Sequence, residues 1–164
     1  MNYISKYKVK NFQEHKKNII NLIFKIPQTI LVGKHERIFH TDWEIPNTMQ
    51  KEYREYFEKN IMEDFLNDFK SKFNFEEVEL DNLWFQVYAK NDFHGIHTHA
   101  KANFTNVFYL QLPSDSVKTD IMNIDITVEE GEILTFPAFL KHQSPINKNE
   151  AFKIIISFNT NIIK

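Results

Sequence analysis

The chain contains no cysteine and only three glycines, Gly33, Gly95 and Gly131, among its 164 residues. Without cysteine it cannot form a disulfide, a thiolate metal site or a cysteine nucleophile. Three scattered glycines cannot build the GxGxxG or GxxxxGK loops that bind phosphates. Nucleotide-binding sites of these kinds are therefore excluded by inspection.

The chain also lacks long apolar runs and an excess of positive charge. No run approaches the roughly 20 apolar residues of a membrane-spanning helix. The opening "MNYISKYKVK" lacks the apolar core of a signal peptide, so we expect a cytoplasmic protein without membrane contact. The formal net charge of −2 argues against a protein whose main role is to bind nucleic-acid phosphates.

Apolar and aromatic side chains, by contrast, are abundant. Hydrophobic residues make up 42% of the chain and aromatic residues 15%, and there are 16 phenylalanines. This composition is globular, and the length suits one domain with one core. We therefore expect a single domain over residues 1–164.

The first half of the chain shows helical periodicity. Residues 11–25 predict a short helix, and residues 48–73 predict a long one that Asn47 or Thr48 can cap. An apolar residue recurs every four positions along the long helix, at Tyr53, Phe57, Ile61, Phe65, Phe69 and Phe73. Such a stripe is typical of a core face, although it could also pair two subunits into a homodimer.

From residue 75 onward the pattern changes to short β-branched and aromatic segments separated by turn residues. The predicted strands are 73–80, 82–90, 104–112, 123–130, 132–140 and 152–162. Helices followed by a β-rich half favour an α+β domain. The strands are expected to form a sandwich or jelly roll with the N-terminal helices buttressing one sheet.

The segment "NDFHGIHTHA", residues 91–100, holds three of the seven histidines. Residues two apart on a strand share a face, so His97 and His99 would project together and could chelate a divalent metal. His142, which follows an apolar strand, is the best candidate for a third ligand. An H-x-H pair can also be ordinary surface polarity, and His94 could form a hydrogen bond or face a substrate as readily as bind metal.

Two further segments are irregular enough to overhang a pocket and set specificity, namely residues 30–50 and 112–122. The first contains His40 with Asp42 nearby. This pair could be an outlying part of an active site, and a capped loop explains it equally well.

Several motifs of the C-terminal half resemble those of a known family. "LWFQVYAKNDFHGIHTHAKANFTNVFYLQL" is similar to W-x-N-x-Y, then G-D-x-H-x-x-H-x-H, then S-G-V-Y-Y-L. "VEEGEILTFPAFLKHQSP" resembles P-x-x-G-x-L-x-x-F-P-x-x-x-x-H-x-V-x-P, and "KIIISFN" resembles R-x-S-I-S-F-N. Together, over residues 84 to about 160, they resemble the 2-oxoglutarate (2OG)/Fe(II)-dependent oxygenases related to prolyl 4-hydroxylases. The resemblance implies a double-stranded β-helix, a jelly-roll, cupin-like fold preceded by helices.

The resemblance also implies a metal site. In the family, H-x-D/E and a distal histidine hold Fe(II) and leave positions for 2OG and oxygen. His97 matches the first ligand, His142 matches the distal one, and His99 stands where the carboxylate is usual. A three-histidine site still binds iron but removes one negative charge from it. If His99 is not a ligand, water or a carboxylate such as Asp92 could take its place.

The cosubstrate residues follow from the same motifs. Lys153 matches the cation that binds the distal carboxylate of 2OG, and Tyr109 matches a tyrosine that assists it. Tyr88 matches a tyrosine that faces the cosubstrate, and Gln86 stands on the same strand face. Simple core packing is an equal alternative for Tyr88 and Tyr109.

The implied activity is that of an Fe(II)- and 2OG-dependent dioxygenase, a hydroxylase that uses oxygen and acts on an unidentified substrate. Two other functions fit the same residues. One is a three-histidine cupin-type dioxygenase that does not use 2OG, and the other is a non-enzymatic jelly-roll module that binds a partner or a sugar.

Overall fold

The computed structural model describes residues 3–46 and 48–163, and its helical elements lie mainly in the first half of the chain. The helices are α1 (Phe12–Ile23), α2 (Glu52–Phe57), the π-helical segment η1 (Glu58–Met62), α3 (Glu63–Phe73) and the 3₁₀ turn η2 (Asp115–Val117). The early strands are β1 (Ser5–Lys8), β2 (Leu31–Val32), β3 (Glu36–Ile38) and β4 (His40–Thr41). The later strands are β5 (Val78–Tyr88), β6 (Phe93–His97), β7 (Phe104–Gln111), β8 (Asp120–Ile121), β9 (Glu132–Pro137), β10 (His142–Ser144) and β11 (Lys153–Ile162).

The strands form two antiparallel sheets. The larger sheet has the order β1-β9-β7-β11-β5-β4, and the smaller has the order β2-β3-β6-β10-β8. The sheets share an apolar cluster to which β3 and β8 of the small sheet contribute Ile38 and Ile121, and the large sheet contributes Tyr109, Leu134 and Ile155. The predicted α+β class and double-stranded β-helix, or jelly roll, are confirmed.

Strict alternation along β5 and β11 gives the large sheet two different faces. On β5, Phe85 and Val87 belong to the cluster beneath the helices, whereas Gln86 and Tyr88 point between the sheets. On β11, Ile154 and Ile156 face the helices, and the intervening residues face the small sheet. The same alternation therefore supplies a core on one side and places polar side chains between the sheets on the other.

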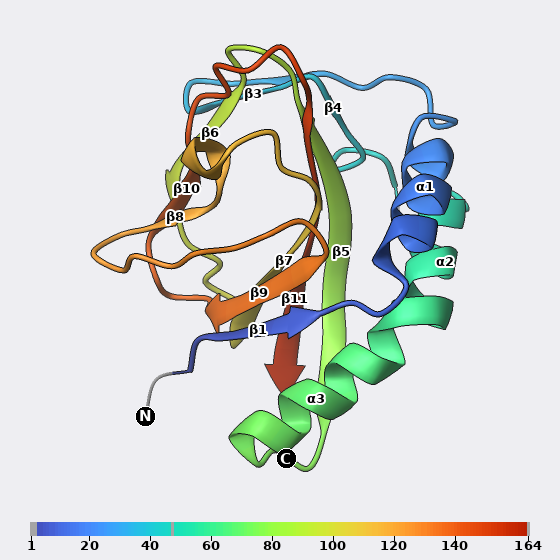
Figure 1. The fold of residues 1–164 in the computed structure, drawn as a ribbon, viewed down its shortest axis with the longest axis vertical. Coiled ribbons are helices and arrows are strands. Elements are labelled where there is room, and N and C mark those ends of the chain that lie inside the picture. Colours follow the sequence, from blue (N-terminus) through green and yellow to red (C-terminus); the bar gives the residue numbers. More distant parts are fainter. Residues whose placement is uncertain (1–2, 47, 164) are drawn as a thin grey trace.

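The helices cover the outer face of the large sheet, away from β6, β8 and β10 (Figure 1). This is the predicted buttress. Most of the aromatic stripe is buried there, at Tyr53, Phe57, Ile61, Phe65 and Phe69. The stripe therefore packs against the chain's own sheet and is not a surface for pairing subunits.

Several predicted boundaries were wrong. The long helix begins at Glu52 after Lys51, so Thr48 does not cap it, and Asn47 lies outside the described residues. The two strands predicted over 73–80 and 82–90 are the single strand β5.

Two other strand predictions also failed. Residues 91–95 lie outside the predicted strands, which end at 90 and resume at 104, yet Phe93–Gly95 belong to β6. Residues 123–130 were predicted to be a strand, yet they run irregularly apart from an isolated bridge between Ile121 and Ile124. Short strands β1 to β4 were not predicted, because two to four residues carry too little periodicity.

Within the described residues, no helix combines the length and apolar character that a membrane crossing requires.

Candidate metal centre

The small sheet brings three histidines together. His97 ends β6 and His142 begins β10, and these two residues are direct partners in the antiparallel pairing. His99 follows two residues after His97, beyond the end of the strand. One ring nitrogen from each of the three histidines lies within 4.8 Å of the others. Three imidazoles at this spacing can share one divalent metal ion.

Backbone carbonyls orient two of these rings. His97 Nδ1 lies 2.7 Å from the Gly95 carbonyl oxygen, and His142 Nδ1 lies 2.9 Å from that of Leu140. A carbonyl oxygen only accepts, so each Nδ1 donates its proton and each Nε2 keeps a free lone pair. This arrangement is typical of metal-ligating histidines.

His99 has a different environment. Its Nδ1 lies 3.4 Å from the side-chain nitrogen of Asn159, and among the described residues no carbonyl oxygen accepts a hydrogen bond from it. Its ring also lies near the indole of Trp84, with 5.8 Å between ring centroids. The carbonyl contacts that orient His97 and His142 are therefore not repeated at His99.

Burial keeps the clustered imidazoles uncharged. Desolvation, with a smaller contribution from the neighbouring histidines, lowers the pKa of His142 to about 3 against the opposing effect of the Leu140 carbonyl, and lowers that of His99 to about 4. Desolvation also lowers the pKa of His97, although the Gly95 carbonyl opposes this shift. Neutral imidazoles are the form that binds metal, so the cluster does not need to lose protons at neutral pH.

His94 and Asp92 lie near the cluster but are not part of it. The His94 ring stacks on His97 at 3.9 Å between centroids, and its Nδ1 lies 3.5 Å from Gln86 Nε2. Asp92 is buried, and its carboxylate accepts hydrogen bonds from Arg37 and from the Ala89 backbone. Asp92 is thus occupied in a turn and does not complete the cluster.

Lys153 lies behind the histidines on the inner face of the large sheet. It is fully buried, with 0% of its surface exposed, and its ammonium donates to Ser144 Oγ at 2.7 Å. The same nitrogen lies 5.1 Å from the centre of the Tyr88 ring. Desolvation lowers its pKa to about 7, and no carboxylate in the described part of the chain forms an ion pair with it. A buried cation in this position has the character of an anion-binding group.

The remaining predicted residues lie on the same inner face. Gln86 accepts a hydrogen bond from Ser157 at 3.0 Å. The Tyr109 hydroxyl donates to Thr119 Oγ1 at 2.8 Å, and burial raises the pKa of Tyr109 to about 12. Burial also raises the pKa of Tyr88. Tyr109 is therefore directed at Thr119 and has no direct contact with Lys153 among the hydrogen bonds of the described residues.

Comparison with known proteins was informative only at the level of structure. Neither protein-family models nor curated protein sequences matched this chain. Among solved structures, a viral collagen prolyl hydroxylase from Paramecium Bursaria Chlorella virus-1, in its 2OG complex, is 17% identical with a TM-score of 0.64, over 98% of this chain and 97% of that one.

Two bacterial structures extend the likeness. A 2OG-Fe(II) oxygenase family oxidoreductase from Burkholderia pseudomallei is 10% identical with a TM-score of 0.71, over 96% of this chain and 84% of that one. HygX from Streptomyces hygroscopicus, with nickel and 2OG bound, is 9% identical with a TM-score of 0.65, over 99% and 84% respectively. This chain has the fold of the 2OG/Fe(II) oxygenases.

Sequence reasoning missed some polar residues near the histidine cluster and Lys153. Ser144, the partner of Lys153, lies two residues after His142 and shares its strand face, so the period-two rule could have found it. Thr119 and Ser157 also line the inner pocket. No local sequence signal marks Thr119, because only the packing of the loop before β8 brings it to Tyr109.

Of the two segments expected to overhang the pocket, residues 30–50 contribute more. They supply Glu36, Ile38 and Trp43 to a cleft beside the histidines, whereas 112–122 supplies Thr119. His40 does not reach the cluster. It is buried in β4 with its Nδ1 accepting from the Thr29 backbone, and Asp42 pairs with Lys51 instead.

Proposed function

We propose that this protein is an Fe(II)- and 2OG-dependent oxygenase that hydroxylates its substrate, with His97, His99 and His142 as metal ligands. One observation carries the proposal: three neutral imidazoles converge within 4.8 Å in front of a fully buried lysine. The fold, which is that of proteins with this chemistry, supports the proposal.

The donor set fits Fe(II). Imidazole nitrogen is a suitable ligand for iron, and His97 and His142 have the outer carbonyl contacts that hold a ligating ring in place. When bound, Fe(II) and 2OG would supply oxidative decarboxylation of 2OG to succinate and carbon dioxide, with the second oxygen atom of O₂ entering a substrate C–H bond.

Lys153 would bind the distal carboxylate of 2OG. An ammonium is a point charge that pairs with a carboxylate from several directions, and Ser144 already holds it in one orientation. A nearby carboxylate favours the charged lysine, so 2OG would restore a proton to a side chain that burial has made easy to deprotonate.

The inner pocket is narrow, with a volume of about 30 Å³. A bound dicarboxylate would therefore require side chains that line the pocket to move, and Gln86 and Tyr88 are the polar lining residues on β5. The apolar inner faces of Val107 and Ile155 would exclude bulk water, which strengthens charge interactions at Lys153.

The proposal is tested by product formation. Protein loaded with Fe(II) and given 2OG and oxygen should release succinate slowly even without a primary substrate. His142→Ala should abolish this release, and Lys153→Met should raise KM for 2OG far more than it changes kcat. Tight iron binding without succinate would instead support a three-histidine dioxygenase that does not use 2OG. Stable zinc with a closed coordination shell would support a binding module.

A further inference from the structure

A second, larger cleft lies beside two of the three clustered histidines, His97 and His99. Its volume is about 280 Å³, and its walls include His97 and His99 together with Trp43, Trp84 and Glu36. A volume of this size accommodates a small molecule or one side chain of a larger one. A primary substrate would reach the proposed metal ligands through this cleft. The side chains that line the cleft therefore indicate the chemistry of that substrate.

Two indoles form one wall. Trp43 and Trp84 meet edge to face, with 4.8 Å between ring centroids and 72° between ring planes. Trp43 keeps 53% of its surface exposed, while Trp84 is buried. These are the only two tryptophans in the chain.

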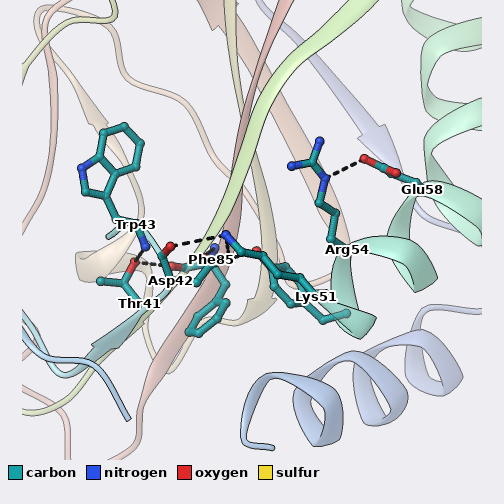
Figure 2. Close-up of polar contacts among 8 residues, drawn as sticks. Thr41, Asp42, Trp43, Lys51, Arg54, Glu58 and Phe85 are labelled. Carbon is teal, nitrogen blue, oxygen red and sulfur yellow. Dashed lines mark hydrogen bonds and ion pairs between the residues drawn. The ribbon is translucent and has the colours of Figure 1, made fainter. Parts of the chain in front are cut away.

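Hydrogen bonds hold Trp43 against β5 before any ligand arrives (Figure 2). Thr41 Oγ1 donates to the Phe85 carbonyl at 2.7 Å, and the Phe85 amide donates to Asp42 Oδ1 at 2.9 Å. The Trp43 amide donates to Thr41 Oγ1 at 3.3 Å, and Lys51 pairs with Asp42 at 3.0 Å. The loop is thus clamped beside Trp84, the residue before Phe85, so the wall is preorganised.

Glu36 supplies the charge of the cleft. Of the described residues that line it, Glu36 is the one with a formal charge at neutral pH. It lies on β3 opposite His94, its carboxylate sits over Gly33, and its negative charge acts on His97. No cationic side chain in the described part of the chain pairs with it.

We propose that this cleft binds the primary substrate through a positively charged nitrogen, an alkylammonium or guanidinium group, held between the Trp43–Trp84 wall and Glu36. Calling this ligand the substrate rests on the proposed oxygenase function, whereas the binding itself does not. Among aromatic side chains, indole attracts organic cations most strongly, and a carboxylate completes the match. An anionic ligand would meet Glu36 without a compensating cation in the cleft.

The test uses the two tryptophans as its reporter. Metal-free protein is titrated with choline and with 3,3-dimethylbutan-1-ol, its uncharged counterpart of nearly the same shape, while tryptophan fluorescence is recorded. Choline should change the fluorescence with an affinity about tenfold or more above that of the alcohol. A parallel titration with methylguanidinium shows whether the cleft binds a planar guanidinium more tightly than the ammonium of choline.

Matched variants identify the groups responsible. Glu36→Gln keeps the shape and should reduce the preference for choline to near unity, whereas Glu44→Gln, an exposed carboxylate beside Trp43 but outside the cleft, should leave it unchanged. Equal affinities for choline and the alcohol, the absence of any fluorescence change, or a preference that survives in Glu36→Gln would overturn the proposal. Thermal unfolding of each variant confirms that it is folded.

The two proposals fail separately. The titration needs neither iron nor 2OG, so cation binding without succinate release removes the oxygenase function and keeps the cleft assignment. Succinate release without cation binding would keep the oxygenase function and remove the cleft assignment.

Discussion

At the residue scale, His99 is where this chain departs from the H-x-D/E pattern that it resembles. It lies in the cluster, yet it lacks the carbonyl contact that orients His97 and His142. The two well-oriented histidines should therefore contribute more to metal affinity than His99 does.

Substitutions at these positions test that ranking. His97→Ala and His142→Ala should abolish Fe(II) binding, and His99→Ala should weaken it by about 10- to 100-fold. His99→Asp should keep or strengthen binding, because it creates the two-histidine, one-carboxylate ligand set. Anaerobic competition with a chromophoric chelator measures each affinity, with His15→Ala as a remote control. Wild-type affinity in His99→Ala would show that His99 is not a ligand.

Lys153 predicts an unusual dependence of stability on pH. Burial lowers its pKa from the ordinary 10.5 to about 7. Between these values the unfolded chain holds a proton that the folded chain lacks, so stability should rise with pH from about 7 toward 10, by at most about 1.4 kcal/mol per pH unit. Below about pH 7 both states are protonated and this contribution is constant.

Urea unfolding of the metal-free protein at pH 6, 7, 8 and 9 checks this expectation. Lys153→Met should flatten the rise and increase stability at pH 7, since it removes a buried charge. Lys34→Met, at an exposed lysine, serves as the control. A slope that persists in Lys153→Met would assign the effect to another group.

The sequence predicted the site residues that belong to recognisable local motifs. It missed those that long-range strand pairing brings to the site. Strand alternation suggested His97, the position after an apolar strand suggested His142, and the family resemblance suggested Lys153. The structure brings all three to one inter-sheet region. Glu36 and Trp43 reach the cleft only because β3 pairs with β6 and the Trp43 loop is bonded to β5. Long-range pairing of this kind leaves no periodic signal.

At the element scale, the continuous helix formed by α2, η1 and α3 keeps apolar residues that are spaced four apart on one face. An α-helix turns about 100° per residue, so each four-residue step overshoots a full turn by about 40°. Along the predicted stripe, this accumulated rotation would turn the last aromatic side chains of a regular α-helix away from the sheet. The π-helical segment Glu58–Met62 has more residues per turn and offsets the drift, which keeps Phe65 and Phe69 buried.

A one-residue deletion tests this role of the π segment. Removing Lys59, which is exposed within the segment, should convert it to ordinary α-helix and destabilise the protein by about 1 kcal/mol or less. Removing Asn67, exposed in α3, should rotate Phe69 out of the core by about 100° and cost several times more. Denaturant unfolding compares the two, and equal losses would contradict the account.

Strand prediction succeeded where alternation is long and failed where polar residues interrupt it. The predicted strands 73–80 and 82–90 left out Asp81, yet β5 continues through it. Asp81 is the extra residue at a register shift, because β11 pairs Asn159 with Asn82 and Thr160 with Leu80. Residues 123–130 have strand-like composition but remain unpaired apart from one bridge, because tertiary context overrides propensity.

At the scale of the whole molecule, the candidate site depends on both sheets. The small sheet supplies His97 and His142, and the large sheet supplies Lys153, Tyr88 and Gln86 from its inner face. The helices pack on the opposite face and leave this region open to the cleft. The sandwich itself, more than any single loop, sets the separation between the proposed metal ligands and the proposed anion-binding lysine.

That separation is tested most directly by anaerobic visible spectroscopy of the Fe(II)-loaded protein during titration with 2OG. A single molecule of 2OG that spans the metal and Lys153 should produce a weak metal-to-ligand absorption band. The band should be lost in His142→Ala, and in Lys153→Met it should appear only at much higher 2OG concentrations. An absent band in the wild-type protein, or one that His142→Ala and Lys153→Met leave unchanged, would contradict the account.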